Sequence, residues 1–259
     1  MLSTLPLEFI GLAHRLADAS GTVIRQYFRT PVAVDDKPDS SPVTIADREA
    51  ERVMRELIQQ AYPEHGIYGE EMGVENQDAE FVWVLDPIDG TKSFITGKPL
   101  FGTLISLLHH GQPILGMIDQ PITRERWIGG IDLPTTLNGQ AVKVRNCANL
   151  SQAILYATTP LMFEGQDKVA FERLCQQIKL PLYGADCYAY ALLAMGFVDL
   201  VVEADLSPYD YCSHVPIIEQ AGGVITDWQG QALGLDSDGR VVAAGDKALH
   251  QQVLNVLSG

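Results

Sequence analysis

Cysteine is scarce in this 259-residue sequence, and none of its four cysteines belongs to a CxxC pair. The six histidines are scattered, apart from the neighbours His109 and His110. A zinc site or a disulfide framework is therefore not expected. His109 and His110 stand between an apolar run and Gly111, a pattern that favours a hairpin turn over a metal site.

Positive charge is also in short supply, with 18 lysines and arginines against 33 acids and a net charge of −15. Such a chain repels phosphate backbones and anionic lipid, so neither nucleic acid nor a membrane is expected as a partner. No run of about 18 apolar residues is present, and no basic segment precedes an apolar core at the N-terminus. Cytoplasmic residence is the default expectation.

Hydrophobic residues make up 46% of the chain, enough for the core of one large domain or two small ones. Amphipathic periodicity predicts helices over 7–28 and 46–61, with a polar loop over 35–42 between them. Alternating apolar runs over 103–131 predict antiparallel strands. The first half, residues 1–134, is thus expected to be an α+β domain.

Strands and helices alternate in the second half, which predicts an α/β domain over 135–259 with its own sheet. A boundary is expected near Pro134. The predicted strands cover 154–158, 198–202, 224–227 and 241–243, and the predicted helices cover 167–178, 187–195, a segment after Asp210 and the C-terminal end.

The segment WVLDPIDGT, from Trp83 to Thr91, ends a buried strand on two carboxylates, Asp86 and Asp89. Acids at a strand end mark a site, because they do not stabilise an apolar core. Two carboxylates in one tight turn repel each other unless a proton or a divalent cation lies between them. Oxygen ligands alone suit Mg²⁺, Mn²⁺ or Ca²⁺. The alternative is an Asx-type turn that closes the strand.

Two further acids lie in similar settings. Glu70 follows a helix that is expected to end near Tyr62, and it precedes the WVLDPIDGT strand closely enough to fold back beside it. Asp210 follows Ser207 at the start of a predicted helix. Capping of that helix is the alternative role for Asp210, since helix N-termini favour carboxylates.

Three blocks together, VTIAD with GEE, WVLDPIDGT, and SPYDYCSHVPIIEQAGG, resemble the inositol monophosphatase family of Mg²⁺-dependent phosphomonoesterases over nearly the whole chain. Within it the sequence is most similar to the histidinol-phosphate phosphatase branch, through ATTP and YGADCYAYALLAMGFVDLVVEADLSPYDY. The resemblance implies an α/β fold, a layered α-β-α-β-α sandwich with the site in the cleft between the halves. It also implies a homodimer.

The resemblance implies a set of metal ligands. Asp86 would bridge two ions, Glu70 and the main-chain carbonyl of Ile88 would complete one coordination shell, and Asp89 with Asp210 would complete the other. The four carboxylates carry about four negative charges, which two divalent ions would neutralise. The expected cofactor is Mg²⁺, with a third, weaker ion on the Glu70 side and Mn²⁺ as a substitute.

The same resemblance assigns catalytic roles to Thr91, Asp47 and Glu70, the first two orienting the attacking water. For Asp47 a capping box beginning at Thr44 is the alternative. Backbone N–H groups at Gly90 and Thr91 are expected to hold phosphate oxygens, because glycine allows close approach. Lys37 is either a loop contact with the substrate or a solvated side chain.

Substrate choice is expected to come from the second half, where no lysine or arginine occurs between positions 180 and 239. A second phosphate group would find no cation in that stretch, whereas a cationic leaving group fits its nine acids. Asp186 and Glu203 are expected to receive the amine and imidazole of histidinol phosphate, with Asp210 as a further substrate contact. The alternatives are a cap on the helix at Cys187 for Asp186, and contact with inositol hydroxyls for Glu203.

Two rival functions remain open. One is a phosphatase of the same family that acts on inositol phosphates or on a broad range of sugar phosphates. The other is a non-catalytic cation-binding regulatory protein. An EF-hand is excluded, because a loop beginning at Asp86 would need an acid at its twelfth position, which is Gly97.

Overall fold

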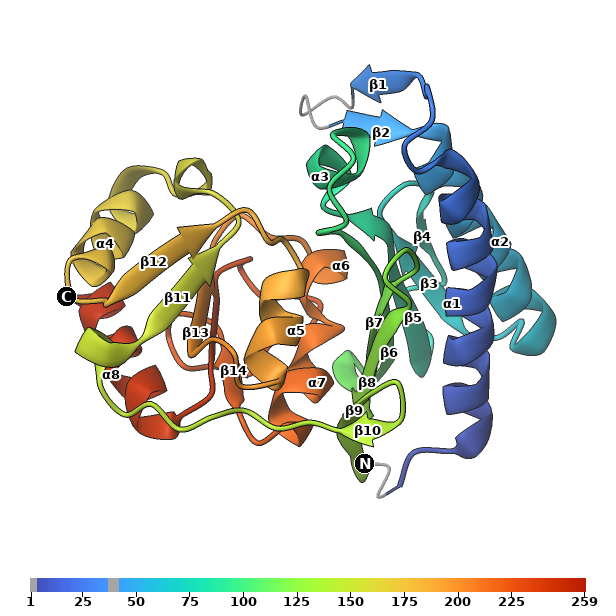
Figure 1. The fold of residues 1–259 in the computed structure, drawn as a ribbon. Coiled ribbons are helices and arrows are strands. Elements are labelled where there is room, and N and C mark those ends of the chain that lie inside the picture. Colours follow the sequence, from blue (N-terminus) through green and yellow to red (C-terminus); the bar gives the residue numbers. More distant parts are fainter. Residues whose placement is uncertain (1–3, 37–41) are drawn as a thin grey trace.

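The computed structural model describes residues 4–36 and 42–259, so Lys37 and the role predicted for it lie outside the described residues. Five layers are stacked side by side (Figure 1): a helical pair, a sheet, a central helical layer, a second sheet and a second helical pair. This arrangement is the predicted α-β-α-β-α sandwich.

The helices are α1 (Leu7–Tyr27), α2 (Ile45–Ala61), α3 (Thr91–Ile95), α4 (Gly165–Cys175), α5 (Tyr188–Ala194), α6 (Pro208–Tyr211), α7 (His214–Gln220) and α8 (Lys247–Ser258), with 3-10 turns η1 (Leu150–Gln152) and η2 (Pro160–Met162). The pair α1 and α2 covers the outer face of the first sheet, and α4 and α8 cover the outer face of the second (Figure 1). Three short helices, α5, α6 and α7, lie between the sheets.

The first sheet has eight strands in the order β10-β9-β8-β7-β6-β5-β3-β4. They are β3 (Gly66–Gly69), β4 (Gly73–Glu75), β5 (Phe81–Asp89), β6 (Gly102–His109), β7 (Gln112–Gln120), β8 (Glu125–Gly130), β9 (Leu133–Leu137) and β10 (Gln140–Ala141). All neighbours are antiparallel except β3 and β5, which run parallel. The carboxyl ends of β3 and β5 therefore meet at the same edge of the sheet.

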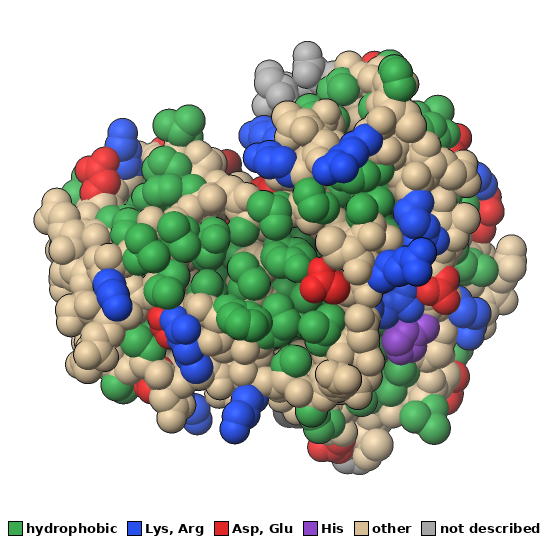
Figure 2. All heavy atoms as spheres, viewed as in Figure 1, with side chains coloured by type: hydrophobic (Ala, Val, Ile, Leu, Met, Phe, Trp, Pro, Cys, Tyr) green, Lys and Arg blue, Asp and Glu red, His purple; other side chains and the backbone are tan. Residues whose placement is uncertain are grey.

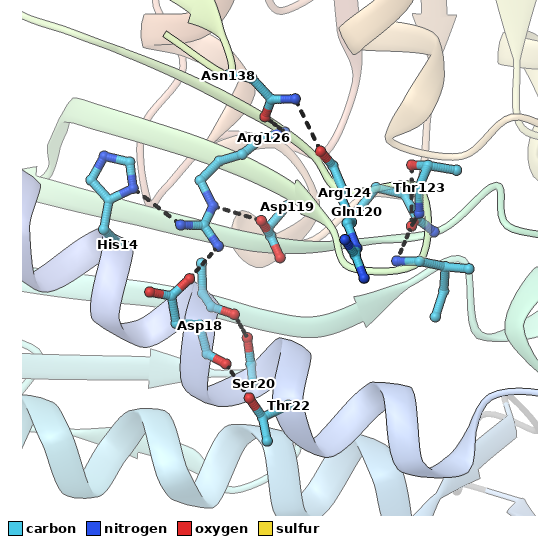
Figure 3. Close-up of polar contacts among 12 residues, drawn as sticks. His14, Asp18, Ser20, Thr22, Asp119, Gln120, Thr123, Arg124, Arg126 and Asn138 are labelled. Atoms are coloured by element: carbon cyan, nitrogen blue, oxygen red, sulfur yellow. Dashed lines mark hydrogen bonds and ion pairs between the residues drawn. The ribbon is translucent and has the colours of Figure 1, made fainter.

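Arg126 on β8 fastens α1 to this sheet (Figure 3). Its Nε lies 2.6 Å from Oδ1 of Asp119 on β7, and its Nη2 lies 2.8 Å from Oδ1 of Asp18 on α1. Its Nη1 lies 3.1 Å from Nδ1 of His14, whose pKa is lowered by burial and by Arg126. A neutral ring that accepts from the guanidinium fits this arrangement. Two of these three bonds reach α1 and fix its register on the sheet.

The second sheet has five strands in the order β12-β11-β13-β15-β14. They are β11 (Ile154–Ala157), β12 (Leu180–Tyr183), β13 (Leu200–Glu203), β14 (Val224–Thr226) and β15 (Val241–Ala244). The first three of the sheet order are parallel, and β15 runs antiparallel to both of its neighbours. Apolar side chains of β13 and β15 are fully buried between the helical layers, as their continuous apolar runs predict.

Several predicted boundaries were wrong. The ends of the loop predicted over 35–42 are strands, because β1 (Val34–Asp36) pairs with β2 (Pro42–Thr44). β12 was not predicted, because it is short and contains Pro181, a residue that an edge strand tolerates. β13 begins two residues after the predicted start, although the N–H of Asp199 before it still donates to the carbonyl of Ile154 while its side chain binds Arg145.

The change of sheet falls later than the boundary predicted near Pro134. That proline lies inside β9, and the first sheet continues to Ala141. A division of the chain into two domains remains a proposal. Among the described residues, no helix has both the length and the apolar character that crossing a membrane requires.

Candidate functional site

A bulge at the end of β5 brings Asp86 and Asp89 together. The pairing of β5 with β6 shifts by one residue between Asp86 and Asp89, which oppose Leu104 and Gly102. Residues three apart in a regular strand point to opposite faces, and the one extra residue turns both carboxylates to the same side. The hydroxyl of Thr103 donates to the carbonyl of Pro87 over 2.9 Å and holds the bulge.

Glu70 joins them because β3 and β5 are parallel. It follows the last residue of β3, and its N–H donates to the carbonyl of Leu85, over 3.1 Å. The side chains of Glu70 and Asp86 are close enough to share a hydrogen bond. The predicted fold-back of Glu70 beside the WVLDPIDGT strand is thus confirmed.

A buried ion pair on α2 supports the turn that carries Glu70. Arg55 Nε lies 2.8 Å from Oε1 of Glu51, and both side chains are almost fully buried. The two oxygens of Glu51 also accept the N–H groups of Glu71 and Met72, over 2.7 and 3.0 Å. Motif reading missed this pair, although Glu and Arg four residues apart on a predicted helix were the available signal.

Asp210 approaches from the second half, on the short helix α6. Its Oδ2 accepts the N–H of Ser207 over 2.7 Å in a capping box, so the capping role is confirmed. One oxygen each of Asp86, Asp89 and Asp210 nevertheless lies within 4.8 Å of the other two. Asp210 therefore caps α6 and belongs to the acidic cluster at the same time.

The electrostatics of this cluster favour a bound cation. Burial, followed by repulsion from Glu70, Asp89 and Asp210, raises the pKa of Asp86 well above its usual range. Burial, followed by Asp186 and Asp210, does the same to the pKa of Asp89. The largest electrostatic contributions to both shifts come from other acids rather than from lysine or arginine. Converging, buried carboxylate oxygens fit hard divalent cations such as Mg²⁺ or Mn²⁺.

Asp47 lies at the start of α2, close enough to Glu70 to feel its charge. Its Oδ2 accepts from the N–H and the hydroxyl of Thr44, over 2.9 and 2.6 Å, which confirms the capping box. Its Oδ1 is buried and has no partner among the described residues. A buried carboxylate oxygen without a partner is costly, so Oδ1 is suited to a bound water or ion.

The turn after β5 exposes main-chain donors next to the cluster. Gly90 has a φ of 86°, a conformation that favours glycine, and it caps α3. Because the first N–H groups of a helix have no partner within it, those at the start of α3 are available to an anion. The hydroxyl of Thr91 donates to the carbonyl of Ile88 over 3.1 Å. Thr91, the predicted catalytic residue, and Ile88, the predicted carbonyl ligand, therefore lie in the same small turn.

Asp186 extends from the second half toward this turn. Its Oδ2 accepts from the hydroxyl of Ser93 over 3.0 Å, and a methyl group added at Gly90 would lie 3.0 Å from the same oxygen. Cys187 is the N-terminal cap of its helix and receives no side-chain capping bond, so the capping alternative for Asp186 was wrong. The Cys187 N–H instead donates to Oδ2 of Asp89 over 2.6 Å.

The cations nearest to Asp186 come from the first half. Burial raises the pKa of Asp186, while Ser93, Lys98 and Lys92 act in the opposite direction. The second half lacks lysine and arginine between positions 180 and 239, but the first half supplies positive charge to the same site. Sequence reasoning missed Ser93 and both lysines, because no local pattern links them to a residue about ninety positions away.

Glu203 is the last residue of β13 and is 3% exposed. Its Oε1 accepts the N–H of Thr158 over 2.7 Å, and its Oε2 accepts the hydroxyl of Tyr190 over 2.9 Å. Burial raises its pKa to about 7, although both bonds favour the ionised form. Each carboxylate oxygen of Glu203 thus already accepts a hydrogen bond from within the protein.

Comparisons with known proteins agree with this geometry. A sequence model of the inositol monophosphatase family matches residues 6–258. The chain is 55% identical over 259 residues to a protein of Arabidopsis thaliana named bifunctional phosphatase IMPL2, chloroplastic, a match that covers 96% of this chain and 75% of that protein. It is 33% identical over 234 residues to a histidinol-phosphatase of Chlorobaculum parvum, with 90% of each chain covered.

Solved structures give the same result for the fold. An inositol monophosphatase from Zymomonas mobilis superposes with a TM-score of 0.91 at 47% identity, covering 99% of this chain and 100% of that one. An inositol monophosphatase from Anabaena superposes with a TM-score of 0.84 at 30% identity, covering 97% and 96%. The layered α/β fold predicted from the sequence is confirmed.

Proposed function

Because the chain belongs to the inositol monophosphatase family and is a phosphoric monoester hydrolase, we propose that it hydrolyses L-histidinol phosphate to L-histidinol and phosphate in histidine biosynthesis. The observation that carries the proposal is the Asp186 carboxylate, which lies against the Gly90 turn where the substrate phosphate would bind. A carboxylate there favours a substrate with a cationic leaving group. The similarity to a protein named histidinol-phosphatase supports the same choice.

The proposed metal ligands are the carboxylates of Glu70, Asp86, Asp89 and Asp210 with the carbonyl of Ile88. They would hold two Mg²⁺ ions, with a third, weaker ion on the Glu70 side, and Mn²⁺ could replace Mg²⁺. When bound, such ions lower the pKa of a coordinated water and neutralise charge on the phosphate group.

Side-chain and main-chain groups of the protein would position the attacking water and the phosphate. Asp47 would accept a hydrogen bond from the attacking water through its buried Oδ1, and Thr91 would hold that water from the opposite side of the turn. N–H groups at Gly90 and Thr91 would bind phosphate oxygens at the start of α3. Together these groups fix the angle of attack, which is the main contribution of a protein to phosphoryl transfer.

Recognition of the leaving group would fall to two acids in different ways. Asp186 would bind the amine of histidinol directly, since its carboxylate is only half-buried. Glu203 would act indirectly, because both of its oxygens already accept internal bonds. By holding the Thr158 N–H and the Tyr190 hydroxyl it would shape the wall against which the imidazole packs.

The test is release of phosphate from histidinol phosphate, inositol monophosphate and a 3′,5′-bisphosphate nucleotide, each with Mg²⁺ and with a chelator. A Mg²⁺-dependent preference for histidinol phosphate would support the proposal. A preference for inositol monophosphate would keep the chemistry and overturn the substrate. No turnover of any of the three would favour the non-catalytic, cation-binding alternative.

A substitution at Asp186 separates recognition from chemistry. Asp186→Asn removes the charge at a position with a φ of 46°, a conformation that asparagine tolerates. We expect kcat/KM to fall by about tenfold or more for histidinol phosphate and by much less for inositol monophosphate. Asp205→Asn is the matched control, because Asp205 is an exposed acid with a φ of 60° in the same half. Equal losses on both substrates would mean that Asp186 has a structural role.

Inositol monophosphatase activity is the second candidate function, favoured by the similarity to the Zymomonas mobilis enzyme. Lys92 and Lys98 also lie near Asp186 and supply positive charge that the second half lacks at this point. A substrate with more negative charge could therefore bind. The three-substrate assay therefore includes a nucleotide with a second phosphate group.

A homodimer remains our proposal for the oligomeric state. Figure 2 shows hydrophobic side chains gathered on the face that carries α5, β11 and β12. Leu180 in β12 and Phe197 after α5 are exposed hydrophobic residues, at 43% and 62%. Light scattering on the purified chain tests the dimer.

Cytoplasmic residence also remains a prediction.

A further inference from the structure

Glu80, His109 and His110 converge at the turn between β6 and β7. One side-chain nitrogen or oxygen from each lies within 4.8 Å of the other two. The sequence explained the two histidines as a hairpin turn, and the structure confirms that turn. It also brings Glu80, the residue before β5, beside them. We propose that these three residues form a binding site for one divalent transition-metal ion of the Zn²⁺ type.

The site is distinct from the acidic cluster. Phe81 pairs with His109 at one end of β5, whereas Asp86 and Asp89 stand at the other end. Six residues of strand separate Glu80 from Asp86, which corresponds to about 20 Å. An ion at Glu80 therefore shares no ligand with the proposed magnesium site, and the inference does not rest on the proposed function.

Contacts within the protein order the turn and the two histidine rings. The N–H of His110 donates to the carbonyl of Glu80 over 2.9 Å, which ties the turn to the start of β5. The ring of His109 stacks on Phe81 with centroids 4.9 Å apart, and the ring of His110 lies 4.2 Å from that of His109. Ordering of ligands before binding lowers the entropic cost of taking up an ion.

The spacing of the ligand atoms fits one ion. Nε2 of His109 lies 3.1 Å from Oε1 of Glu80. Two bonds of about 2.1 Å from a tetrahedral ion place their ligand atoms roughly 3.4 Å apart. Water would complete the coordination, because Glu80 and His110 are both exposed to solvent.

The donor types set the class of ion. Two imidazole nitrogens and one carboxylate oxygen suit Zn²⁺, Ni²⁺ or Cu²⁺. Mg²⁺ prefers oxygen ligands and keeps its water, so the histidine site and the acidic cluster would select different ions from a mixture. The net charge of −15 raises the local concentration of any divalent cation near the surface.

A purely structural role is the competing explanation. Tyr62, His65, Phe81, His109 and His110 form a continuous series of ring contacts along this edge of the molecule. Stacking alone would account for His109. The approach of Glu80 to Nε2 of that ring is a hydrogen bond of 3.1 Å, which forms without an ion. Neither contact accounts for the exposed second histidine, which offers a ring nitrogen within 4.8 Å of the other two ligand atoms.

The test is titration of the full-length protein with Zn²⁺ in excess Mg²⁺, followed by calorimetry, together with electron paramagnetic resonance of bound Cu²⁺. We expect one equivalent of Zn²⁺ to bind, and nitrogen couplings in the Cu²⁺ spectrum. No histidine belongs to the acidic cluster in the described residues, so nitrogen couplings exclude that cluster as the Cu²⁺ site. Loss of these couplings in His110→Asn then assigns them to the proposed site.

Two variants remove ligands with little effect on folding. His110→Asn is the sharper one, because His110 has a φ of 50° and asparagine is well suited to that conformation. Glu80→Gln removes the carboxylate. Each should weaken Zn²⁺ binding by at least about tenfold, the loss that even an outer partner of a metal site can cause. Glu64→Gln is the matched control, since Glu64 is an exposed acid that lies 3.9 Å from a single histidine, His65.

The outcomes separate the two explanations. Weakened Zn²⁺ binding in His110→Asn and Glu80→Gln, with unchanged binding in Glu64→Gln, would support the site. Unchanged Zn²⁺ affinity in all three variants, or a Cu²⁺ spectrum with oxygen ligands only, would overturn it and leave the ring contacts as a structural feature.

Discussion

At the residue scale, single carboxylates serve a helix end and the acidic cluster at the same time. Asp47 uses Oδ2 for its capping box and leaves Oδ1 buried without a partner among the described residues. Asp210 caps α6 while one of its oxygens lies within 4.8 Å of those of Asp86 and Asp89. A capped helix start is rigid, so it positions a ligand with little cost in entropy.

Asp89→Asn tests the charge of the cluster. We expect phosphate release to fall by about a hundredfold or more, because a metal ligand loses its charge. In chelator, the free energy of unfolding should stay level or rise, since one of several repelling buried carboxylates is removed. Phosphate assays and urea unfolding measure both effects. Full activity in this variant would refute the proposed ligand set.

Glu203→Gln tests the pKa of a buried acid. Burial raises the pKa of Glu203 from 4.5 to about 7, so the folded state binds this proton more tightly than the unfolded state. Its contribution to stability is therefore complete below pH 4.5 and is lost as the pH rises through about 7. The contribution is on the order of 3 kcal/mol, at about 1.4 kcal/mol for each pH unit between the two values.

The measurement is urea unfolding in chelator at several pH values for wild type and Glu203→Gln. The free energy of unfolding of the wild type should fall relative to that of the variant between pH 4.5 and about 7. Parallel curves over this range would show that the pKa of Glu203 is not shifted.

At the scale of elements, α2 organises one side of the site from two points along its length. Its first turn carries Asp47, and the Glu51–Arg55 pair one turn later holds the segment that contains Glu70. Gly69 is required at this contact, because a methyl group added there would overlap the Glu51 carboxylate. A rotation of α2 would therefore displace a ligand and a proposed water contact together.

Glu51→Gln tests this support. The change leaves Arg55 without its buried partner, so we expect a loss of about 3 kcal/mol in the free energy of unfolding. The Mg²⁺ concentration for half-maximal activity should also rise, because the turn that carries Glu70 is loosened. Urea unfolding and activity titrations measure the two effects.

Glu56→Gln is the matched control on the same helix. Glu56 pairs with Arg52 at the same four-residue spacing, but both side chains are about half exposed, and such pairs contribute roughly 0.5 kcal/mol or less. A similar loss in Glu51→Gln and Glu56→Gln would contradict a special role for the buried pair.

The sequence predicted much of the fold at this scale and part of the site. Periodicity predicted α1 and α2 closely, and the WVLDPIDGT motif predicted the buried strand β5 that ends on two carboxylates. It did not predict the contact of Asp186 with Ser93, because the two positions are separated by ninety-three residues and neither lies in a periodic segment. Short strands such as β12 were missed because tertiary pairing, not local preference, holds them.

At the scale of the whole molecule, the two halves of the chain share an apolar core and are also joined by polar contacts around the cluster. The Cys187 N–H donates to Asp89 and the Ser93 hydroxyl donates to Asp186, each bond joining the two halves of the chain. The cluster combines carboxylates from both halves, so repulsion between them opposes the contact of the halves. A divalent cation would reverse the sign of that interaction.

Mg²⁺ should therefore stabilise the whole protein. At a concentration one hundred times its dissociation constant, an ion that binds only the folded state adds about 2.7 kcal/mol. We expect a higher Tm with Mg²⁺ than with chelator, and loss of this difference in Asp210→Asn. Thermal denaturation followed by circular dichroism measures it. An identical Tm in Mg²⁺ and in chelator would argue against a metal that joins the halves.

Recognition of a cationic leaving group by Asp186 is tested by the ratio of kcat/KM for L-histidinol phosphate to that for inositol monophosphate, measured with Mg²⁺ on wild type and on Asp186→Asn. We expect a ratio well above one in wild type that drops by about tenfold in the variant. A wild-type ratio below one, or a ratio that Asp186→Asn leaves unchanged, would contradict it.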